Sequence, residues 1–511
     1  VVVGALAGSD LTLLRAATQV ALWCFVATVF VAVSHRMIPF FSASALPALD
    51  AWRPMWLLWT MVAALWGEAF AAVADALDNG VGMVSALMLE DTSGRTVYKV
   101  FEPGGADELP GFACASNLLL MADPASLKVL PWLPDTGWLQ CQPWFDTGLP
   151  VELDTRRVLQ KALSHLADAG LGMVCGLEVE FHIYRIKDTS PQLDPTQAGW
   201  PGLPPAVDMI HPGYNLHSET CLDMSEEALS IVRDTAQALG LPLQSLEIEL
   251  GPSQIEAVFD ATDALTAADN MVLFRNGVRQ ALRQKGYHAT FMCRPPFPHI
   301  MSSGWHLHQS LVRLDNGKNA FMRDAPHPGT TAQDARHTLT DLGTHYLAGL
   351  LAHAQGMAVL CTPTVNGFGR FRPNALAPQA VLWGKDNRGA MLRVVGQAGD
   401  KATRIENRLG EPAANPYLYM ATQIYAGLDG VARELLPPVA TDTPYGNTAA
   451  EQIPGDLGQA LAALRADSEL CAALGKSFVS YLCRCKQSEL DRYNAAEDKD
   501  DFQRREYFSR I

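Results

Sequence analysis

The sequence predicts an α+β protein, in which a β-rich module precedes helices packed on a mainly antiparallel sheet. Short runs of alternating polar and apolar residues, typical of strands, are interspersed along the chain with longer runs of helical periodicity. The chain has 511 residues, of which 48% are hydrophobic and 18% charged. This length is sufficient for several domains with a large core.

The first 68 residues differ from the rest because two apolar runs, Ala17–Val33 and Pro54–Trp66, dominate them. Each run is at or below the length of about 20 residues that a membrane-spanning helix needs. Flanking residues could complete a span, so two membrane helices and membrane contact through residues 17–66 remain open. The stretch SHRMIPFFSASALPALDAWRPMWLLW resembles part of the NnrS family of membrane proteins. We interpret residues 1–68 as a piece joined to an unrelated soluble protein.

Residues 69–150 predict a small β-rich domain. Ala69–Asn79 has the pattern of a short helix, which Asn79 and Gly80 end. Turn signals such as Pro103-Gly104-Gly105 separate short β-like runs after it. The expected strands are Gly82–Leu89, Arg95–Phe101, Asn117–Ala122 and Lys128–Leu130.

Residues 151–511 predict the larger domain, in which helices and strands follow one another. A helix begins near Thr155 and closes at Gly170, and Asp188–Asn215 is rich in proline and glycine, as loops are. The expected strands are Gly176–Arg185, Leu246–Leu250 and His306–Val312. The expected helices are Ser225–Leu239, Ala264–Lys285, Ala332–His353, Pro416–Leu435 and further helices within Asp456–Ile511.

Charge and cysteine content argue against a protein that binds nucleic acid non-specifically and against a protein with a cysteine-based metal site. The formal net charge is −15, whereas proteins that bind nucleic acid non-specifically need a basic surface. The ten cysteines are scattered, and no CxxC pair typical of a metal site occurs among them. Reduced thiols of a cytoplasmic protein are therefore expected.

The segment Gly176–Arg185 places Glu178 and Glu180 on one face of an expected strand, because side chains two residues apart point the same way. Two carboxylates on one face cost free energy unless a positive group lies between them. A solvated edge strand would tolerate the pair, and a divalent cation would stabilise it.

Three further segments carry titratable side chains at related spacing. They are His306 and His308 in SSGWHLHQSL, Arg404, Glu406 and Arg408 in ATRIENRLG, and Glu249 and Glu256 in SLEIELGPSQIEAVF. A protein core cannot bury such a set unpaired, so one cavity that holds metal ions and a polyanionic ligand is the economical explanation. Carboxylates with one imidazole per site suit Mg²⁺ or Mn²⁺ better than zinc.

A run of basic residues accompanies these segments. Its members are Arg370, Arg372, Lys385, Arg388, Arg393, Lys401, Arg404 and Arg408. They alternate with glycine and apolar residues, as the lining of a cleft does, although a solvated basic face is the alternative. Arginine binds carboxylate and phosphate through two parallel hydrogen bonds, so the run predicts a site for both groups.

Five motifs resemble those of the glutamine synthetase family in order and approximate spacing. They are GLEVEFHIY, ELGPSQIE, SSGWHLHQSL, KDNRGAMLRV and RIENRLGEPAANPYLY. The resemblance covers about residues 75–511 and points to the subgroup of ligases that join glutamate to amines, such as γ-glutamylpolyamine and γ-glutamylanilide synthetases. It implies a partial β-grasp domain over residues 69–150 and, over residues 151–511, a catalytic domain whose antiparallel sheet forms a funnel.

The resemblance also implies the ligands and the residues that hold them. Glutamate, ATP and an amine would be the substrates, with Mg²⁺ or Mn²⁺ as cofactor. One metal site would use Glu180, Glu249 and Glu256, and the other Glu178, His306 and Glu406. The nucleotide side would comprise His308, Arg388, Arg393, Lys401 and Arg404, and the substrate site Arg370, Arg408, Ser302 and Leu376, with Arg370, Arg388 and Arg408 as catalytic residues.

The implied reaction activates the γ-carboxylate of glutamate, which is a poor acyl donor because its leaving group would be oxide. ATP converts it to an acyl phosphate, and an amine then attacks to form an amide. Metal ions and arginines would neutralise and align the phosphates. The resemblance further implies a homo-oligomer of stacked rings in the cytoplasm, or at a membrane if residues 17–66 anchor it.

The chain departs from the family pattern at the acceptor subsite. Leu376 stands where ammonia-using members carry a flap glutamate, and their Asp-Gly-Ser-Ser element is missing from the region around Asp107. An ammonium ion needs carboxylates that hold and deprotonate it. The departures therefore predict a larger, partly apolar amine as acceptor, and Leu376 favours an apolar amine over a polyamine.

Two alternatives remain open at this point. Ammonia could still be the acceptor, which would make the protein a glutamine synthetase proper. Met301 and Ser302 replace an Asn-Gly pair of ammonia-using members, and the first strands of the β-grasp domain are replaced by residues 1–68. A truncated domain would expose a sheet edge and could impair assembly, which favours a non-catalytic glutamine-synthetase-like binding protein.

Overall fold

The computed structural model describes residues 78–373 and 375–511. The predicted apolar runs of residues 17–33 and 54–66, and the NnrS-like stretch, lie outside the described residues. None of the helices formed by the described residues is long and apolar enough to cross a membrane.

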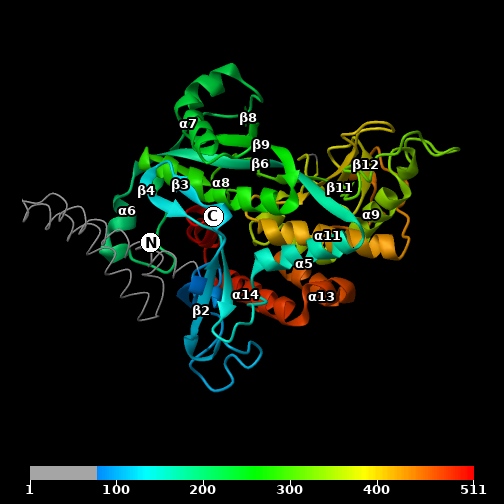
Figure 1. The fold of residues 1–511 in the computed structure, drawn as a ribbon. Coiled ribbons are helices and arrows are strands. Elements are labelled where there is room, and N and C mark those ends of the chain that lie inside the picture. Colours follow the sequence, from blue (N-terminus) through cyan, green and yellow to red (C-terminus); the bar gives the residue numbers. More distant parts are fainter. Residues whose placement is uncertain (1–77, 374) are drawn as a thin grey trace, which may run out of the picture. The chain divides into compact units, whose positions relative to one another are not determined.

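The described chain forms two compact units of a mixed α+β fold, as predicted (Figure 1). The first unit comprises residues 78–89, 98–128 and 137–154, and the second comprises residues 90–97, 129–136 and 155–511. A small sheet organises the first unit and a nine-stranded sheet the second.

The small sheet is antiparallel, with the strand order β1-β2-β5. Its strands are β1 (Val81–Val84), β2 (Asn117–Ala122) and β5 (Cys141–Phe145). The strand predicted over Asn117–Ala122 is confirmed, and so is Lys128–Leu130, which is β3 and pairs with β4 (Leu133–Trp138).

Two other strand predictions in this region are wrong, wholly or in part. The strand predicted over Gly82–Leu89 ends at Val84, because Ser85–Leu89 forms a 3-10 helix whose first amide donates to the carbonyl of Ser116. Arg95–Phe101 is irregular and ends in a turn at Val100 and Phe101, with one isolated bridge between Glu90 and Thr96. Alternating polarity alone does not distinguish a turn-rich segment from a strand that finds a partner.

The larger sheet is built around β6 (Leu171–Asp188), which pairs with four other strands. Along its main path the order is β12-β13-β14-β11-β6-β9-β8, and β7 and β10 also pair with β6. The other strands are β7 (Ala206–Met209), β8 (Leu243–Ile248), β9 (Gln254–Asp263), β10 (Tyr287–Thr290), β11 (Trp305–Arg313), β12 (Trp383–Lys385), β13 (Leu392–Val395) and β14 (Arg404–Gly410). Only β12 and β13 are parallel, so the predicted mainly antiparallel sheet is confirmed.

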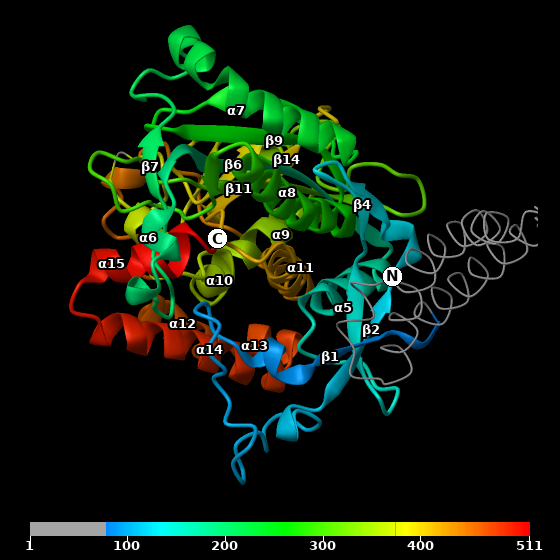
Figure 2. The ribbon, with the colours of Figure 1, turned by 90° about the vertical axis from the view of Figure 1, so that its left-hand side faces the viewer.

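The two faces of β6 have different environments, which follows from the alternation of its side chains. Phe181 is buried and packs edge-on against Phe274 of α8 (Ala264–Gln284), at 5.8 Å between ring centroids. Helix α8 therefore covers the apolar face, and α7 (Glu219–Ala238) packs against α8 and β8 (Figure 2). Glu178 and Glu180 belong to the opposite face.

Two helix starts differ from the prediction for the same physical reason. Helix α7 begins at Glu219 rather than Ser225, because the Ser218 side chain accepts the Cys221 amide and caps the helix. Thr340 likewise caps α9 (Asp341–Ala352), and among the predicted residues before it only Ala335–His337 are helical, as a short 3-10 helix. The remaining α-helices are α5 (Thr155–Asp168), α6 (Ser190–Leu193), α10 (Ala354–Cys361), α11 (Pro416–Ala432), α12 (Leu457–Ala466), α13 (Ser468–Leu474), α14 (Lys476–Ala495) and α15 (Lys499–Gln503).

His353 lies between α9 and α10 and connects them to two other helices. Its Nδ1 is 2.7 Å from the Asp467 carboxylate, which caps α13, and its Nε2 is 2.9 Å from that of Asp429 on α11. Burial by itself would lower the pKa of His353, but hydrogen bonds to the two aspartates outweigh it and raise the pKa above 6.5. The imidazolium is therefore the form that the fold stabilises.

We expect the replacement His353→Asn to remove a pH-dependent part of the stability. A histidine with a raised folded-state pKa adds stability that is fully present below its unfolded-state pKa, about 6.5, and is lost as pH rises through the folded-state pKa. Urea titrations at several pH values measure the free energy of unfolding of both proteins. The excess of the wild type over His353→Asn should shrink as the pH rises above ~6.5. A difference in the free energy of unfolding that stays constant from below to above pH ~6.5 would contradict a charged His353.

Candidate active site

One face of the larger sheet carries a row of titratable side chains, because the strand register sets them opposite one another. The opposed pairs are His306 with Glu178, Glu180 with Glu256, His308 with Glu406, and Glu406 with Arg393. Opposed residues of paired strands point to the same face. The row extends over β13, β14, β11, β6 and β9, so all five of the motifs singled out in the sequence meet on one surface.

Glu178 lies between two imidazoles. One carboxylate oxygen is 3.4 Å from His306 Nδ1, and the other is 2.9 Å from His308 Nε2. Burial raises the pKa of Glu178, but its interactions with the two histidines outweigh burial and hold the pKa well below the usual range. Glu178 is therefore an anion at neutral pH, available to a cation.

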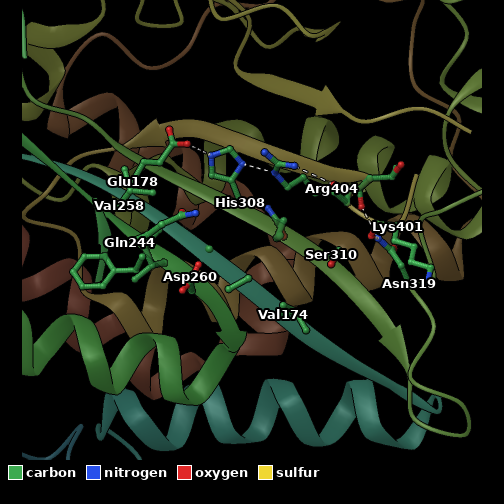
Figure 3. A pocket seen from close by; sticks show the side chains of 17 residues that line it. Val174, Glu178, Gln244, Val258, Asp260, His308, Ser310, Asn319, Lys401 and Arg404 are labelled. Atoms are coloured by element: carbon green, nitrogen blue, oxygen red, sulfur yellow. Dashed lines mark hydrogen bonds and ion pairs between the residues drawn. The ribbon is translucent and has the colours of Figure 1, made fainter. Parts of the chain in front are cut away.

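The proton of His308 is fixed by Arg404, whose Nε donates a 2.9 Å hydrogen bond to His308 Nδ1 (Figure 3). Arginine has no acceptor, so Nδ1 must accept, and the neutral ring carries its proton on Nε2, which faces Glu178. A protonated Nε2 has no lone pair for a metal ion. His308 thus connects Glu178 to Arg404 instead of serving as a ligand.

Glu406 is fully buried between two guanidinium groups. Arg393 Nη1 donates to one of its oxygens at 3.0 Å, and Arg408 Nη1 donates to the other. Burial raises the pKa of Glu406, but the charges of His306, Arg408 and neighbouring groups outweigh it and lower the pKa. The carboxylate is held ionised, and without it Arg408 would lose its ion pair, whereas Arg393 would keep its ion pair with Asp386.

Three further glutamates form an acidic part of the site. Burial first, and then repulsion from neighbouring carboxylates, raise the pKa of Glu256 to about 9 and that of Glu180 to about 7. Burial likewise raises the pKa of Glu249. Glu180 is nevertheless oriented by donors, the Gln254 side chain at 2.9 Å and the Gly304 amide at 3.0 Å. A divalent cation would relieve the repulsion among these groups.

Two groups of described residues have ligand atoms close enough to hold a metal ion. The atoms lie within 4.8 Å of one another in the group Glu178, Glu256 and His306, and in the group Glu178, His308 and Glu406. The tautomer of His308 favours the first group. Carboxylate oxygens with one imidazole are ligands that suit Mg²⁺ or Mn²⁺, so the residues fit the cofactor. The first group combines members of both predicted ligand sets, the second joins Glu178 and Glu406 of one set with His308, and neither group includes the predicted ligands Glu180 and Glu249.

Arg370 is buried beside His306, a member of the row of titratable side chains. Its Nη1 donates to the carbonyls of Arg408 at 2.9 Å and of Gly410 at 3.3 Å, and its Nη2 lies 3.4 Å from His306 Nε2. Gly304 permits this approach, because a Cβ there would lie 2.6 Å from Arg370 Nη2. The guanidinium is thus fixed by backbone groups and faces the cavity.

Two adjoining cavities, of about 330 Å³ and 710 Å³, contain almost all of the predicted site residues. Glu178 lines both cavities, together with Gln244 and Val258. The smaller one is lined by His308, Lys401 and Arg404 (Figure 3). The larger one is lined by Glu180, Glu249, Glu256, His306, Ser302, Arg370, Leu376, Arg388 and Arg408. Arg393 and Glu406 line neither, and Arg393 is paired with Asp386 and Glu406.

Several residues of the larger cavity were missed in the sequence. Glu247 precedes Glu249 by two residues in LEIELG, a spacing that could have singled it out. Leu216 and His217 directly follow the Pro- and Gly-rich stretch Asp188–Asn215 and precede the predicted helix, so nothing in the sequence indicated them. Gln254 lies within the motif ELGPSQIE but was given no role, because its role comes from its contact with Glu180.

Comparison with known proteins agrees with this arrangement. The model of the glutamine synthetase catalytic domain matches residues 152–505. A γ-glutamylanilide synthase of Acinetobacter sp is 39% identical over 84% of this chain and 84% of its own, and a γ-glutamylethanolamide synthetase of Streptomyces coelicolor is 30% identical over 88% and 90%. The solved structure of a GmaS/ADP complex superposes with a TM-score of 0.67 at 27% identity, covering 84% of this chain and 90% of that one.

The fold and the site thus define a carbon–nitrogen ligase that uses ATP and glutamate. The chain belongs to the glutamine synthetase family, and the resemblance of its motifs is confirmed. Divalent metal ions are used in this family, in agreement with the cluster of glutamate and histidine side chains on the sheet.

Proposed function

We propose that this enzyme joins the γ-carboxyl group of glutamate to an amine other than ammonia. The position of Leu376 carries the proposal: its side chain is 61% exposed and lines the larger cavity, and its carbonyl accepts a 3.2 Å hydrogen bond from Arg408. A leucine can neither hold nor deprotonate an ammonium ion. The relatives that form γ-glutamylanilide and γ-glutamylethanolamide support an organic amine as acceptor.

The reaction would proceed in two steps. A γ-carboxylate oxygen of glutamate attacks the terminal phosphorus of ATP, the bond to the bridging oxygen breaks, and ADP leaves. The amine nitrogen then attacks the acyl carbon of γ-glutamyl phosphate, inorganic phosphate leaves, and the nitrogen loses a proton. A bound divalent ion supplies charge neutralisation for the phosphates.

The two cavities suggest how the side chains divide this work. Lys401 and Arg404 in the smaller cavity would bind the nucleotide, and Arg370 and Arg408 in the larger one would hold glutamate and its phosphorylated form. Arg388, also in the larger cavity, would stabilise the transferring phosphoryl group. Glu178 lines both cavities, so we assign the transfer to their junction.

We also infer the setting of the enzyme from the family. The three-stranded sheet of the first unit would be the remainder of a β-grasp domain, with the catalytic domain over residues 151–511. Subunits would assemble into stacked rings. The cytoplasm, where ATP and glutamate are available, would be its compartment, at a membrane if residues 17–66 contact one.

The proposal is tested by measuring phosphate release with ATP, Mg²⁺, glutamate and one acceptor at a time. Ammonia, methylamine, putrescine and aniline form the panel. We expect kcat/KM for an organic amine to exceed that for ammonia by about 10-fold or more. Efficient turnover of ammonia alone would instead identify a glutamine synthetase. Nucleotide binding without turnover of any acceptor would identify a non-catalytic binding protein.

A further inference from the structure

Three exposed apolar residues are among those that line the larger cavity. Leu216, Leu250 and Leu376 are 52%, 37% and 61% exposed, and they come from three separate segments. Much of the buried lining is polar or charged, including His306 and Arg408. Exposed apolar surface beside a polar cavity indicates a ligand with an apolar part outside its reacting group.

The backbone around Leu216 is fixed rather than free. The Tyr214 amide donates to the Leu250 carbonyl at 2.6 Å, and the His217 amide donates to the Ile248 carbonyl at 3.2 Å. Tyr214 and His217 both have positive φ, at 60° and 53°. Such strained conformations persist only where surrounding contacts determine them, and they cluster at binding sites. Leu216 is therefore part of a preformed wall of the cavity.

Glu247, which lines the same cavity, is already engaged by its neighbours. His217 Nε2 lies 3.2 Å from one carboxylate oxygen, and the Ser245 hydroxyl donates to the other at 2.8 Å. A second ammonium group on an acceptor would have to displace His217 to reach this carboxylate. An uncharged alkyl or aryl group would instead pack against the three leucines and would displace no partner of Glu247.

We propose that Leu216, Leu250 and Leu376 form the subsite for the substituent of the acceptor amine, and that Leu216 makes it select an apolar monoamine over a diamine. The inference rests on the proposed function, because it describes the acceptor of that reaction. To the apolar amine already expected from Leu376 it adds the walls of the subsite and a specificity residue, Leu216, that lies outside the segment of Leu376.

The test compares three acceptors, n-butylamine, putrescine of the same carbon length, and ammonia. Wild-type enzyme should prefer n-butylamine to putrescine. The replacement Leu216→Asn keeps the size of the side chain and removes its apolar character, so kcat/KM for n-butylamine should fall about 10-fold, with ammonia changed less than about two-fold. Leu216→Asp should shift the preference toward putrescine.

Leu222→Asn is the matched control, because Leu222 is also exposed, at 42%, but lies on α7 and is not part of the larger cavity. It should retain the wild-type preference. Turnover of ammonia alone by the wild type would overturn both the proposed function and this inference. Turnover of organic amines with the same preference in Leu216→Asn and Leu222→Asn would overturn this inference alone.

Discussion

Replacement of Glu406 by glutamine is expected to lower kcat by about 10²–10³-fold, the range seen when one preorganised electrostatic group is removed from an active site. Glu406 is fully buried and accepts from both Arg393 and Arg408. An amide keeps the shape of the side chain but supplies no negative charge, so the two guanidinium groups would repel each other. It would also weaken the attraction of this part of the site for a divalent ion.

The measurement is ADP formation with saturating ATP, glutamate and the best acceptor, over a range of Mg²⁺ concentrations. Circular dichroism and the unfolding midpoint report whether the variant remains folded. Glu434→Gln makes the same chemical change at an exposed residue outside both cavities and should keep full activity. A folded Glu406→Gln variant with wild-type kcat would refute the place given to Glu406 in the site.

The sequence was informative wherever a functional residue lies on a regular strand. Alternation put Glu178 with Glu180, and His306 with His308, each pair on one face, and the structure has both pairs on the predicted strands. The spacing could not say which histidine meets which glutamate, because that depends on the register between β6 and β11. Both histidines in fact contact Glu178, which only the paired strands reveal.

The run of basic residues shows a second limit of predicting the site from the sequence. Read along the chain, Arg393 and Arg404 belong to one group facing phosphate. In the fold, Arg393 is buried against Glu406 and Asp386, whereas Arg404 holds His308 and lines the smaller cavity. Charge patterning does not distinguish an arginine that compensates a buried carboxylate from one that is available to a ligand.

The loop with Leu216 was inaccessible to sequence reasoning for a conformational reason. Tyr214 and His217 adopt positive φ, although neither is a glycine, and tertiary hydrogen bonds to Ile248 and Leu250 hold them there. Propensity predicts the opposite backbone for such residues. Backbone propensities therefore do not predict the conformation of this wall of the cavity, as is common at binding sites.

Replacement of Arg492 by methionine is expected to lower the free energy of unfolding by about 3–5 kcal/mol, the cost of leaving buried charges unpaired. Arg492 on α14 donates to Asp91 at 3.0 Å and to both oxygens of Glu506, at 2.8 Å and 2.7 Å. The side chains of both acids are fully buried. Denaturant titration measures the loss, and Arg433→Met, which removes a half-exposed ion pair with Asp429, should cost no more than about 1 kcal/mol.

We expect the replacement of Arg492 also to weaken substrate binding at the active site, through the chain segment that follows Arg492. Gln503, three residues before Glu506, accepts a 2.7 Å hydrogen bond from Asn366, which precedes the segment Gly367–Arg370. Local opening around Glu506 would thus release the segment that carries Arg370. KM for glutamate should rise in Arg492→Met under conditions where most molecules remain folded, and remain unchanged in Arg433→Met.

A triple variant separates charge from packing at this position. If the loss in Arg492→Met comes from two unpaired carboxylates, adding Asp91→Asn and Glu506→Gln should restore a large part of the stability, because neutral amides cost less to bury than ions. The guanidinium also lies over the ring of Phe502, at 5.4 Å from its centroid, a contact that methionine only partly replaces. A triple variant no more stable than Arg492→Met would assign the loss to packing and contradict the electrostatic account of this cluster.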